Sequence, residues 1–185
     1  MKPAPRLLIV PGLNDSPAGH WQSELQARFP QAQRVQQRDW VTPELDRWAS
    51  RVGAALERGG SGPCVAVAHS FGALALLRHL LLEPQSPVAL ALLVAPADPD
   101  KFGLAGFLPQ QALRIPHTLA LSSSDPWLRL SVGQRWAARW GSAVVQLGDA
   151  GHVNIASGHG RWAWAERWTE AALQRLGTGE MRDAA

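Results

Sequence analysis

The chain has 185 residues, a formal net charge of +3, and 46% hydrophobic and 18% charged residues. A chain of this length can form one domain that removes roughly 70% of its unfolded surface from water, so it needs no disulfide or metal to complete its core. Its 14 prolines and 17 glycines are scattered, which indicates many short loops and excludes a disordered protein.

The cysteine content and the distribution of charges indicate the cellular location and the kinds of partner to expect. Cys64 is the only cysteine and cannot form an internal disulfide, so a cytoplasmic location is expected. The first apolar stretch, 7–10, ends at Pro11 and is too short for a secretory signal or a membrane span. Lys2 and Lys101 are the only lysines and the arginines are spread out, so we expect neither nucleic acid nor a membrane as a partner.

Short apolar runs bounded by turn-forming residues recur along the chain, and they predict buried parallel strands. The runs cover residues 7–10, 64–68, 88–94, 118–121 and 143–147, with a weaker one at 33–37. Segments with a helical period lie between them. Their predicted N-terminal signals are Ser16-Pro17 for a helix to about Phe29, Thr42-Pro43-Glu44, and a capping box of Ser131 with Gln134.

The last periodic segment covers residues 160–176 and is predicted to stop at Gly177, leaving 178–185 as a frayed, disordered tail. Strands and helices alternate without an internal repeat or linker. This pattern predicts one α/β domain over 1–177, a three-layer α/β/α sandwich around a mostly parallel six-stranded sheet. In such sheets functional residues gather at the carboxyl ends of the strands.

A candidate nucleophile, Ser70, lies between the apolar run 64–68 and the helical run 73–82. A serine at a sharp strand-to-helix turn is typical of the nucleophile elbow of α/β-hydrolases, although Ala68 replaces the first glycine of that motif. The amide of Phe71, at the helix N-terminus, is expected to face a developing oxyanion. The alternative role for Ser70 is a helix cap.

A candidate acid and a candidate base follow the next strands. Asp125 lies in the loop after 118–121, and His152 lies in the loop after 143–147, so the chain order is that of α/β-hydrolases. An imidazole can take the serine proton near neutral pH and return it to the leaving group, while a buried carboxylate fixes its tautomer. The sequence therefore predicts a triad of Ser70, Asp125 and His152.

Other readings of these acids stay open. Asp125 can also be a turn residue or helix cap before Pro126. Asp98 and Asp100, after the strand at 88–94, are reserve candidates for the triad acid, and Asp149 is interpreted as structural. None of the six histidines has metal-ligand spacing to carboxylates or to the cysteine, so neither a metal nor a cofactor is expected.

The loop after the first strand is predicted to complete the site. In this fold a second oxyanion amide comes from that loop, and we expect it to be Leu13 N–H, with Gly12 permitting close backbone approach. An ordinary glycine turn is the alternative. The predicted substrate pocket combines Gly12 with four further residues: Asn14, His20, Trp21 and Trp127. Trp21 could equally anchor the first helix.

The only long insertion between strands covers residues 95–116 and is rich in glycine, proline and phenylalanine. It is the expected lid or pocket rim. Because so short a cap leaves the site open and shallow, small acyl groups are expected rather than long lipids.

Four motifs carry a family resemblance: PGLNDSPAGHWQSEL, VAHSFGALA, SSSDPW and GDAGHVN. Over essentially the whole chain, the sequence resembles small, cap-poor serine hydrolases similar to retinoblastoma-binding protein nine. The opening motif with its His20-Trp21 pair is the most family-specific. The resemblance implies an α/β-hydrolase fold with a minimal cap, the triad above, and esterase- or aminopeptidase-like activity on small substrates.

The leading hypothesis is a serine hydrolase, carboxylesterase-like, that cleaves a small ester or amide through an acyl-enzyme on Ser70. The expected partner is a small-molecule acyl substrate, and the chain is expected to be a monomer or a weak homodimer. Two alternatives stay open: a non-catalytic interaction module on the same fold, and an acyltransferase.

Overall fold

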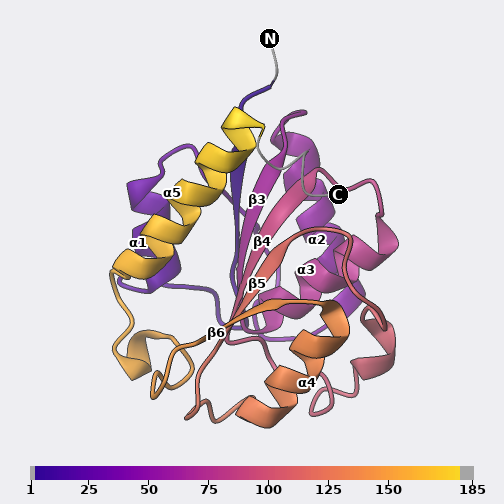
Figure 1. Cartoon of the computed structure of the whole chain (residues 1–185), viewed down its shortest axis with the longest axis vertical. Coiled ribbons are helices and arrows are strands. Elements are labelled where there is room, and N and C mark those ends of the chain that lie inside the picture. The colour runs from indigo at the N-terminus through magenta and orange to yellow at the C-terminus, as the bar shows by residue number, and fades with distance from the viewer. Residues whose placement is uncertain (1–2, 180–185) are drawn as a thin grey trace.

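The computed structural model describes residues 3–179, and one six-stranded sheet organises them. The strand order is β2-β1-β3-β4-β5-β6, and every neighbouring pair is parallel, so the predicted mostly parallel sheet is wholly parallel. The carboxyl ends of the strands lie together at the lower end of Figure 1. The strands are β1 (Arg6–Val10), β2 (Gln33–Arg34), β3 (Cys64–His69), β4 (Val88–Val94), β5 (His117–Leu121) and β6 (Ala143–Gln146).

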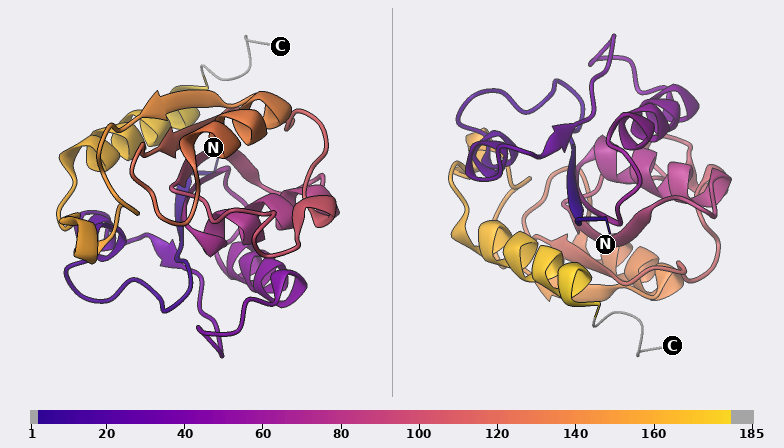
Figure 2. Two further views of the ribbon diagram at one scale, coloured as in Figure 1. Left: turned by 90° about the horizontal axis from the view of Figure 1, so that it is seen from below. Right: turned by 90° about the horizontal axis from the view of Figure 1, so that it is seen from above.

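Helices cover both faces of the sheet, which confirms the three-layer sandwich (Figure 2). Helices α1 (Trp21–Arg28) and α5 (Ala163–Thr178) lie on one face. The other face carries α2 (Leu45–Arg58), α3 (Phe71–Leu82) and α4 (Leu130–Trp140). Two short 3-10 helices, η1 (Ala105–Phe107) and η2 (Ile155–Ser157), lie in the loops.

The core consists of two apolar layers separated by the sheet. Alternate residues of each strand point into opposite layers, so Ala66 and Ala68 of β3 join Trp48 and Phe71 on one face, whereas Val67 joins the Trp21 side. All six residues of β3 are buried, as the continuous apolar runs predicted. Burying a valine side chain such as that of Val67 contributes about 1.5–3 kcal/mol.

Two predicted helix starts are wrong. Helix α1 begins at Trp21 and not at Ser16-Pro17, because His20 is its cap and the Ser16 hydroxyl instead donates to Gln22 Oε1 (2.7 Å). Helix α2 begins at Leu45 after Glu44, and the Thr42 carbonyl accepts from Trp48 Nε1 (3.0 Å). At Ser16 the hydroxyl that was expected to cap the helix thus bonds to a side chain of the helix instead.

The signals for the last two helices are also displaced. Helix α4 begins at Leu130, so the predicted capping box of Ser131 and Gln134 lies inside the helix and makes no cap. Helix α5 continues through Gly177, the predicted stop, and ends at Gly179, whose φ of 82° lies in the left-handed region. Residues 180–185 of the predicted tail lie outside the described residues.

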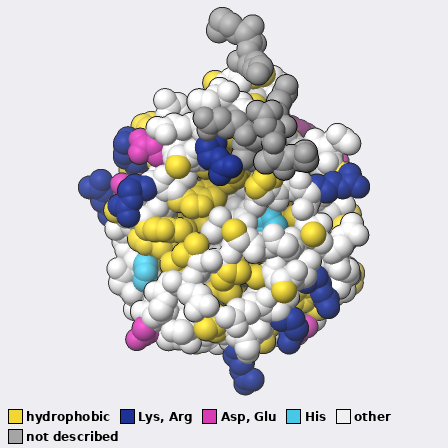
Figure 3. Space-filling model, viewed as in Figure 1, with side chains coloured by type: hydrophobic (Ala, Val, Ile, Leu, Met, Phe, Trp, Pro, Cys, Tyr) yellow, Lys and Arg dark blue, Asp and Glu magenta, His cyan; other side chains and the backbone are white. Residues whose placement is uncertain are grey.

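Strand β6 forms one edge of the sheet and is far less buried than β3. Three of its four residues are exposed, and Val144 keeps 42% of its surface accessible. Hydrophobic side chains gather on the same side of the molecule, the face that Figure 3 presents. Within residues 3–179, no helix has the length and apolar character needed to cross a membrane.

Candidate active site

Ser70 occupies a strained turn between β3 and α3. Its φ of 52° and ψ of −127° are uncommon for a residue with a side chain, and such backbone strain costs on the order of 1–3 kcal/mol. Hydrogen bonds hold the turn in place: Ser70 N–H donates to the Val94 carbonyl (3.1 Å), and the Ser70 carbonyl accepts from Ala73 N–H (3.0 Å). The predicted elbow geometry is therefore present.

Two glycines let the loop after β1 pack against this elbow. A Cβ on Gly72 would lie 2.2 Å from the Pro11 carbonyl oxygen, and a Cβ on Gly12 would lie 2.8 Å from the Ser70 Cβ. No side chain fits at such distances, so glycine is required at both positions. The predicted close approach of Gly12 is present, although Gly12 contacts the nucleophile and does not line the cavity.

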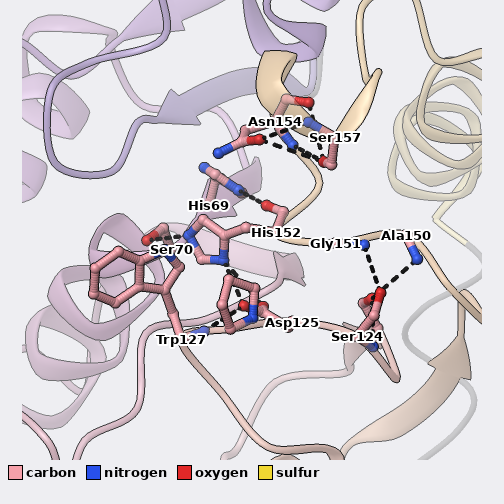
Figure 4. A network of polar contacts seen from close by, with 12 residues as sticks. His69, Ser70, Ser124, Asp125, Trp127, Ala150, Gly151, His152, Asn154 and Ser157 are labelled. Atoms are coloured by element: carbon pink, nitrogen blue, oxygen red, sulfur yellow. Dashed lines mark hydrogen bonds and ion pairs between the residues drawn. The ribbon is translucent and has the colours of Figure 1, made fainter.

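The three residues of the predicted triad are joined by hydrogen bonds (Figure 4). The Ser70 hydroxyl donates to His152 Nε2 (2.9 Å), and His152 Nδ1–H donates to both carboxylate oxygens of Asp125 (3.0 Å each). The Asp125 side chain is only 2% exposed, and its Oδ1 also accepts from Trp127 N–H (2.8 Å). This arrangement fixes the tautomer of the imidazole that places an unprotonated nitrogen against the serine.

Serines of the acid loop connect it to the base loop. Ser122 Oγ accepts from Ala150 N–H (3.1 Å), and Ser124 Oγ accepts from Gly151 N–H (3.0 Å). Asp149 accepts the Ser124 hydroxyl proton, so it has the structural position expected of it. These bonds hold the loop that carries His152 against the loop that carries Asp125.

The reserve acids lie elsewhere. Asp98 Oδ1 accepts from the backbone N–H of Asp100 (3.0 Å), and Asp100 pairs with Arg135 (3.0 Å) at an exposed position. Neither carboxylate hydrogen-bonds to His152. Asp125 is the acid that the fold brings to the imidazole.

Two backbone N–H groups in the loop after β1 and at the start of α3 have no acceptor among the described residues. Among residues 3–179, no acceptor takes the N–H of Leu13 or that of Phe71. Phe71 is the first residue of α3, where a helix leaves its N–H groups without intrahelical partners. Leu13 follows Gly12 in the loop that packs on Ser70. They are the two N–H groups that the sequence predicts as oxyanion donors.

His69 is a site residue that the sequence reasoning missed. Its Nε2–H donates to the His152 carbonyl (2.9 Å), and the centroids of the two rings lie 5.0 Å apart. Burial, together with the nearby His152 and His20 rings, holds the pKa of His69 well below its usual value. His69 is therefore neutral and ties the end of β3 to the base loop.

A cavity of about 440 Å³ opens at Ser70 and His152. Three predicted pocket residues line it: Asn14, His20 and Trp127, together with Leu13. Trp21 does not line it, because this residue is 1% exposed and packs edge-on against His69 and Trp162 in the core. The lining also includes residues that the sequence did not indicate, among them Asn154, Ile155 and Ala156.

The insertion between β4 and β5 forms part of the cavity wall, as the predicted rim. Phe102 lines the cavity and packs against Phe71 at 5.3 Å between ring centroids. Lys101 Nζ donates to the carbonyls of Pro126 and Trp127 (3.1 and 2.9 Å), which attaches the rim to the acid loop. Within residues 3–179, no group of three His, Cys, Asp or Glu side chains is placed to hold a metal ion.

The fold and the site together define the class of protein. A parallel sheet with a serine elbow after β3, and with an acid and a histidine after the later strands, is the arrangement of an α/β-hydrolase. Comparison with known proteins gives the family. The profile described as serine hydrolase matches residues 7–170, and the chain belongs to that family.

Solved structures agree with this assignment. A YdeN-like hydrolase from Pectobacterium atrosepticum is 34% identical, with a TM-score of 0.88 over 94% of this chain and 92% of that chain. The ydeN gene product of B. subtilis is 18% identical, with a TM-score of 0.75 over 93% and 100%. An esterase from Rhodococcus sp. is 15% identical, with a TM-score of 0.67 over 94% and 91%, and shares the fold. No protein among the curated ones matches the chain.

Proposed function

We propose that this serine hydrolase cleaves a small ester or amide through an acyl-enzyme on Ser70. His152 is the general base, Asp125 orients it, and the N–H groups of Leu13 and Phe71 form the oxyanion hole. The observation that carries the proposal is the 2.9 Å hydrogen bond from the Ser70 hydroxyl to His152 Nε2, at a serine held by a strained elbow.

The first half of the reaction follows from these contacts. Ser70 Oγ attacks the substrate carbonyl carbon while its proton passes to His152 Nε2. The negative charge that develops on the carbonyl oxygen is stabilised by the two free N–H groups, and the buried Asp125 carboxylate stabilises the imidazolium. Collapse of the tetrahedral intermediate breaks the bond to the leaving alcohol or amine, which takes the proton from Nε2.

The second half repeats the same chemistry with water. Water gives a proton to His152 Nε2 and attacks the acyl carbon, and the bond to Ser70 Oγ then breaks. The acid product leaves and Ser70 recovers its proton. No group outside the protein and water is needed for the atoms and charges to balance.

The cavity supports a small acyl substrate. Its volume of about 440 Å³ lies at the lower end of the range for ligand pockets, and apolar side chains such as Leu13, Phe102 and Ile155 line it. The free Cys64 is buried, which accords with the proposed cytoplasmic location. We also propose a monomer or weak homodimer that acts without nucleic acid or membrane partners.

Burst kinetics with an activated nitrophenyl ester test the proposal. We expect a rapid release of one nitrophenolate per protein molecule, because acylation of Ser70 precedes slower hydrolysis of the acyl-enzyme. Ser70→Ala, folded as judged by circular dichroism, should give no burst. An equal burst from the variant would contradict the proposal, as would the absence of both burst and turnover on a broad ester panel.

A further inference from the structure

The cavity beside the triad has two chemically different sides. Leu13 and Phe102 are apolar and belong to the side of the sheet covered by α2, α3 and α4. His20 lies at the start of α1, and Asn154 lies in the loop before α5, so both come from elements of the opposite side. The second side therefore carries these two polar side chains beside apolar ones such as Ile155.

His20 presents a hydrogen-bond donor to this second side of the cavity. It caps α1, and its Nδ1 accepts from Gln22 N–H (3.2 Å), so in the neutral ring the proton is on Nε2. Among residues 3–179, Nε2 has no hydrogen-bond partner, although the residue is only 3% exposed and lines the cavity. A donor that lines a cavity and has no protein acceptor is available to an acceptor atom of a ligand.

The position of His20 is fixed by buried polar contacts beneath it. Gln22 is fully buried, and its Nε2 donates to the carbonyls of Val10 (3.2 Å) and Val67 (3.1 Å). Its Oε1 accepts the Ser16 hydroxyl proton (2.7 Å). The start of α1 is thus anchored to β1 and β3, the two strands whose ends carry the oxyanion loop and the nucleophile.

Asn154 presents a second donor, because its side chain also caps a helix through its acceptor atom. Its Oδ1 caps η2 by accepting from Ser157 N–H (3.1 Å) and from the Ser157 hydroxyl (3.3 Å). The amide nitrogen lies on the side of His69, away from Ser157 (Figure 4). Within the described chain no acceptor takes its protons, and Asn154 lines the cavity. In both residues the helix cap uses the acceptor atom and leaves the donor.

The charges around the two donors favour an uncharged ligand group. Burial, the nearby Arg34 and the histidines at 152 and 159 outweigh Asp15 and lower the pKa of His20 to about 4, so its ring is neutral near neutral pH. The Asp15 carboxylate, which also lines the cavity, pairs with Arg34 (2.5 Å). An anionic ligand group would meet no free cation here, whereas a neutral oxygen would receive two hydrogen bonds.

We infer that His20 Nε2–H and Asn154 Nδ2–H together bind an uncharged oxygen of the substrate, a carbonyl, ether or hydroxyl at a distance from the scissile bond. The inference rests on the proposed function, since it places this oxygen in the same molecule whose acyl group reaches Ser70. The substrate class is accordingly an oxygenated small ester or amide, and simple alkyl esters are poorer substrates.

Pairs of esters with the same shape test this inference on the wild-type protein. Nitrophenyl methoxypropanoate and nitrophenyl pentanoate vary the acyl side, while methoxyethyl acetate and butyl acetate vary the leaving group. In at least one pair we expect kcat/KM to favour the oxygenated ester by about tenfold, after correction for its rate of alkaline hydrolysis. Equal values in both pairs would overturn the inference.

Variants at the two caps locate the preference. His20→Asn and Asn154→Ser retain good cap residues and so should preserve folding, which thermal unfolding checks. In each variant the ratio of kcat/KM for the oxygenated ester to kcat/KM for its alkyl partner should fall towards one. His159→Asn makes the same substitution at a histidine that does not line the cavity, and the preference should survive it. A preference that persists in both cap variants would contradict the assignment.

The outcomes separate this inference from the proposed function. Hydrolysis of all esters with a Ser70-dependent burst but without oxygen preference would leave the proposed function intact and remove only the inference. If no ester gives a burst or turnover, the proposed function itself fails.

Discussion

The strand that ends at the proposed nucleophile and the strand that leads to the proposed base differ sharply in burial. Strand β3 is buried along its whole length and pairs with β1 and β4 on either side. Strand β6 pairs only with β5, and most of its residues are exposed. Ser70 is thus placed by the core of the protein, whereas His152 follows the least protected strand.

Hydrogen bonds from neighbouring loops compensate for the weak position of the base. Ser122 and Ser124 bind the backbone of the His152 loop, and His69 binds the His152 carbonyl from the end of β3. Hydrogen bonds therefore fix the position of His152, whereas apolar packing fixes the position of Ser70. We therefore expect substitutions around His152 to lower activity, and substitutions around β3 to lower the stability of the fold.

The largest effect is expected on the base side. Asp125→Asn keeps the shape of the acid but allows the wrong imidazole tautomer, so kcat should fall on the order of 10⁴-fold with little change in thermal stability. Asp100→Asn, at the exposed reserve acid, is the matched control and should change kcat less than about twofold. Steady-state ester hydrolysis measures both. A comparable loss in the control would reassign the acid.

Next in size is a change at the packed elbow. In Gly72→Ala the new Cβ would lie 2.2 Å from the Pro11 carbonyl oxygen, so backbone must move and stability should fall by about 3 kcal/mol. Gly106→Ala, where a Cβ meets nothing within 4 Å, should lie within about 0.5 kcal/mol of the wild type. Urea unfolding of the pair checks this, and equal midpoints would show that the elbow is not tightly packed.

The contributions of β3 and β6 to stability can be compared by making the same Val→Ala substitution in each strand. Val67→Ala in β3 should cost about 2 kcal/mol, since the side chain is fully buried, and Val144→Ala in β6 should cost less than about 0.5 kcal/mol. Chemical denaturation of both variants measures the difference. Similar costs at the two sites would mean that the edge strand is more protected than its exposure indicates.

A further prediction concerns how the stability of the fold depends on pH. His20 has a folded-state pKa of about 4, lowered first by burial, against about 6.5 when unfolded. The unfolded chain therefore binds the proton first, and the stability from neutral His20 is complete above pH 6.5 and lost as the pH falls towards 4. Unfolding of His20→Asn should be less sensitive to pH in this window than that of the wild type. A steeper dependence of stability on pH in His20→Asn than in the wild type would contradict the predicted direction of the pKa shift.

Much of this architecture could be predicted from the sequence, because buried parallel strands appear as continuous apolar runs and the elbow combines a strand, a serine and a helix. The helix starts could not. Ser16 has the residue type of a cap, but its hydroxyl bonds to Gln22 across a turn that only the folded chain forms. The residue type shows that a side chain is able to cap a helix, but the folded structure determines which hydrogen bond that side chain makes.

The same limit applies to the site. The order of Ser70, Asp125 and His152 follows from strand order, so the three residues could be found without coordinates. Whether Trp21 faces the cavity or the core depends on where α1 begins, and that start was predicted too early. The bond from His69 to the His152 carbonyl joins positions 83 residues apart and leaves no local signal.

Mass spectrometry after labelling with a fluorophosphonate tests the central claim most directly. We predict one adduct per wild-type molecule, on the peptide that contains Ser70, with none in Ser70→Ala and much slower labelling in His152→Ala. Folded wild-type protein that stays unlabelled, or that carries the adduct on another residue, would contradict the account.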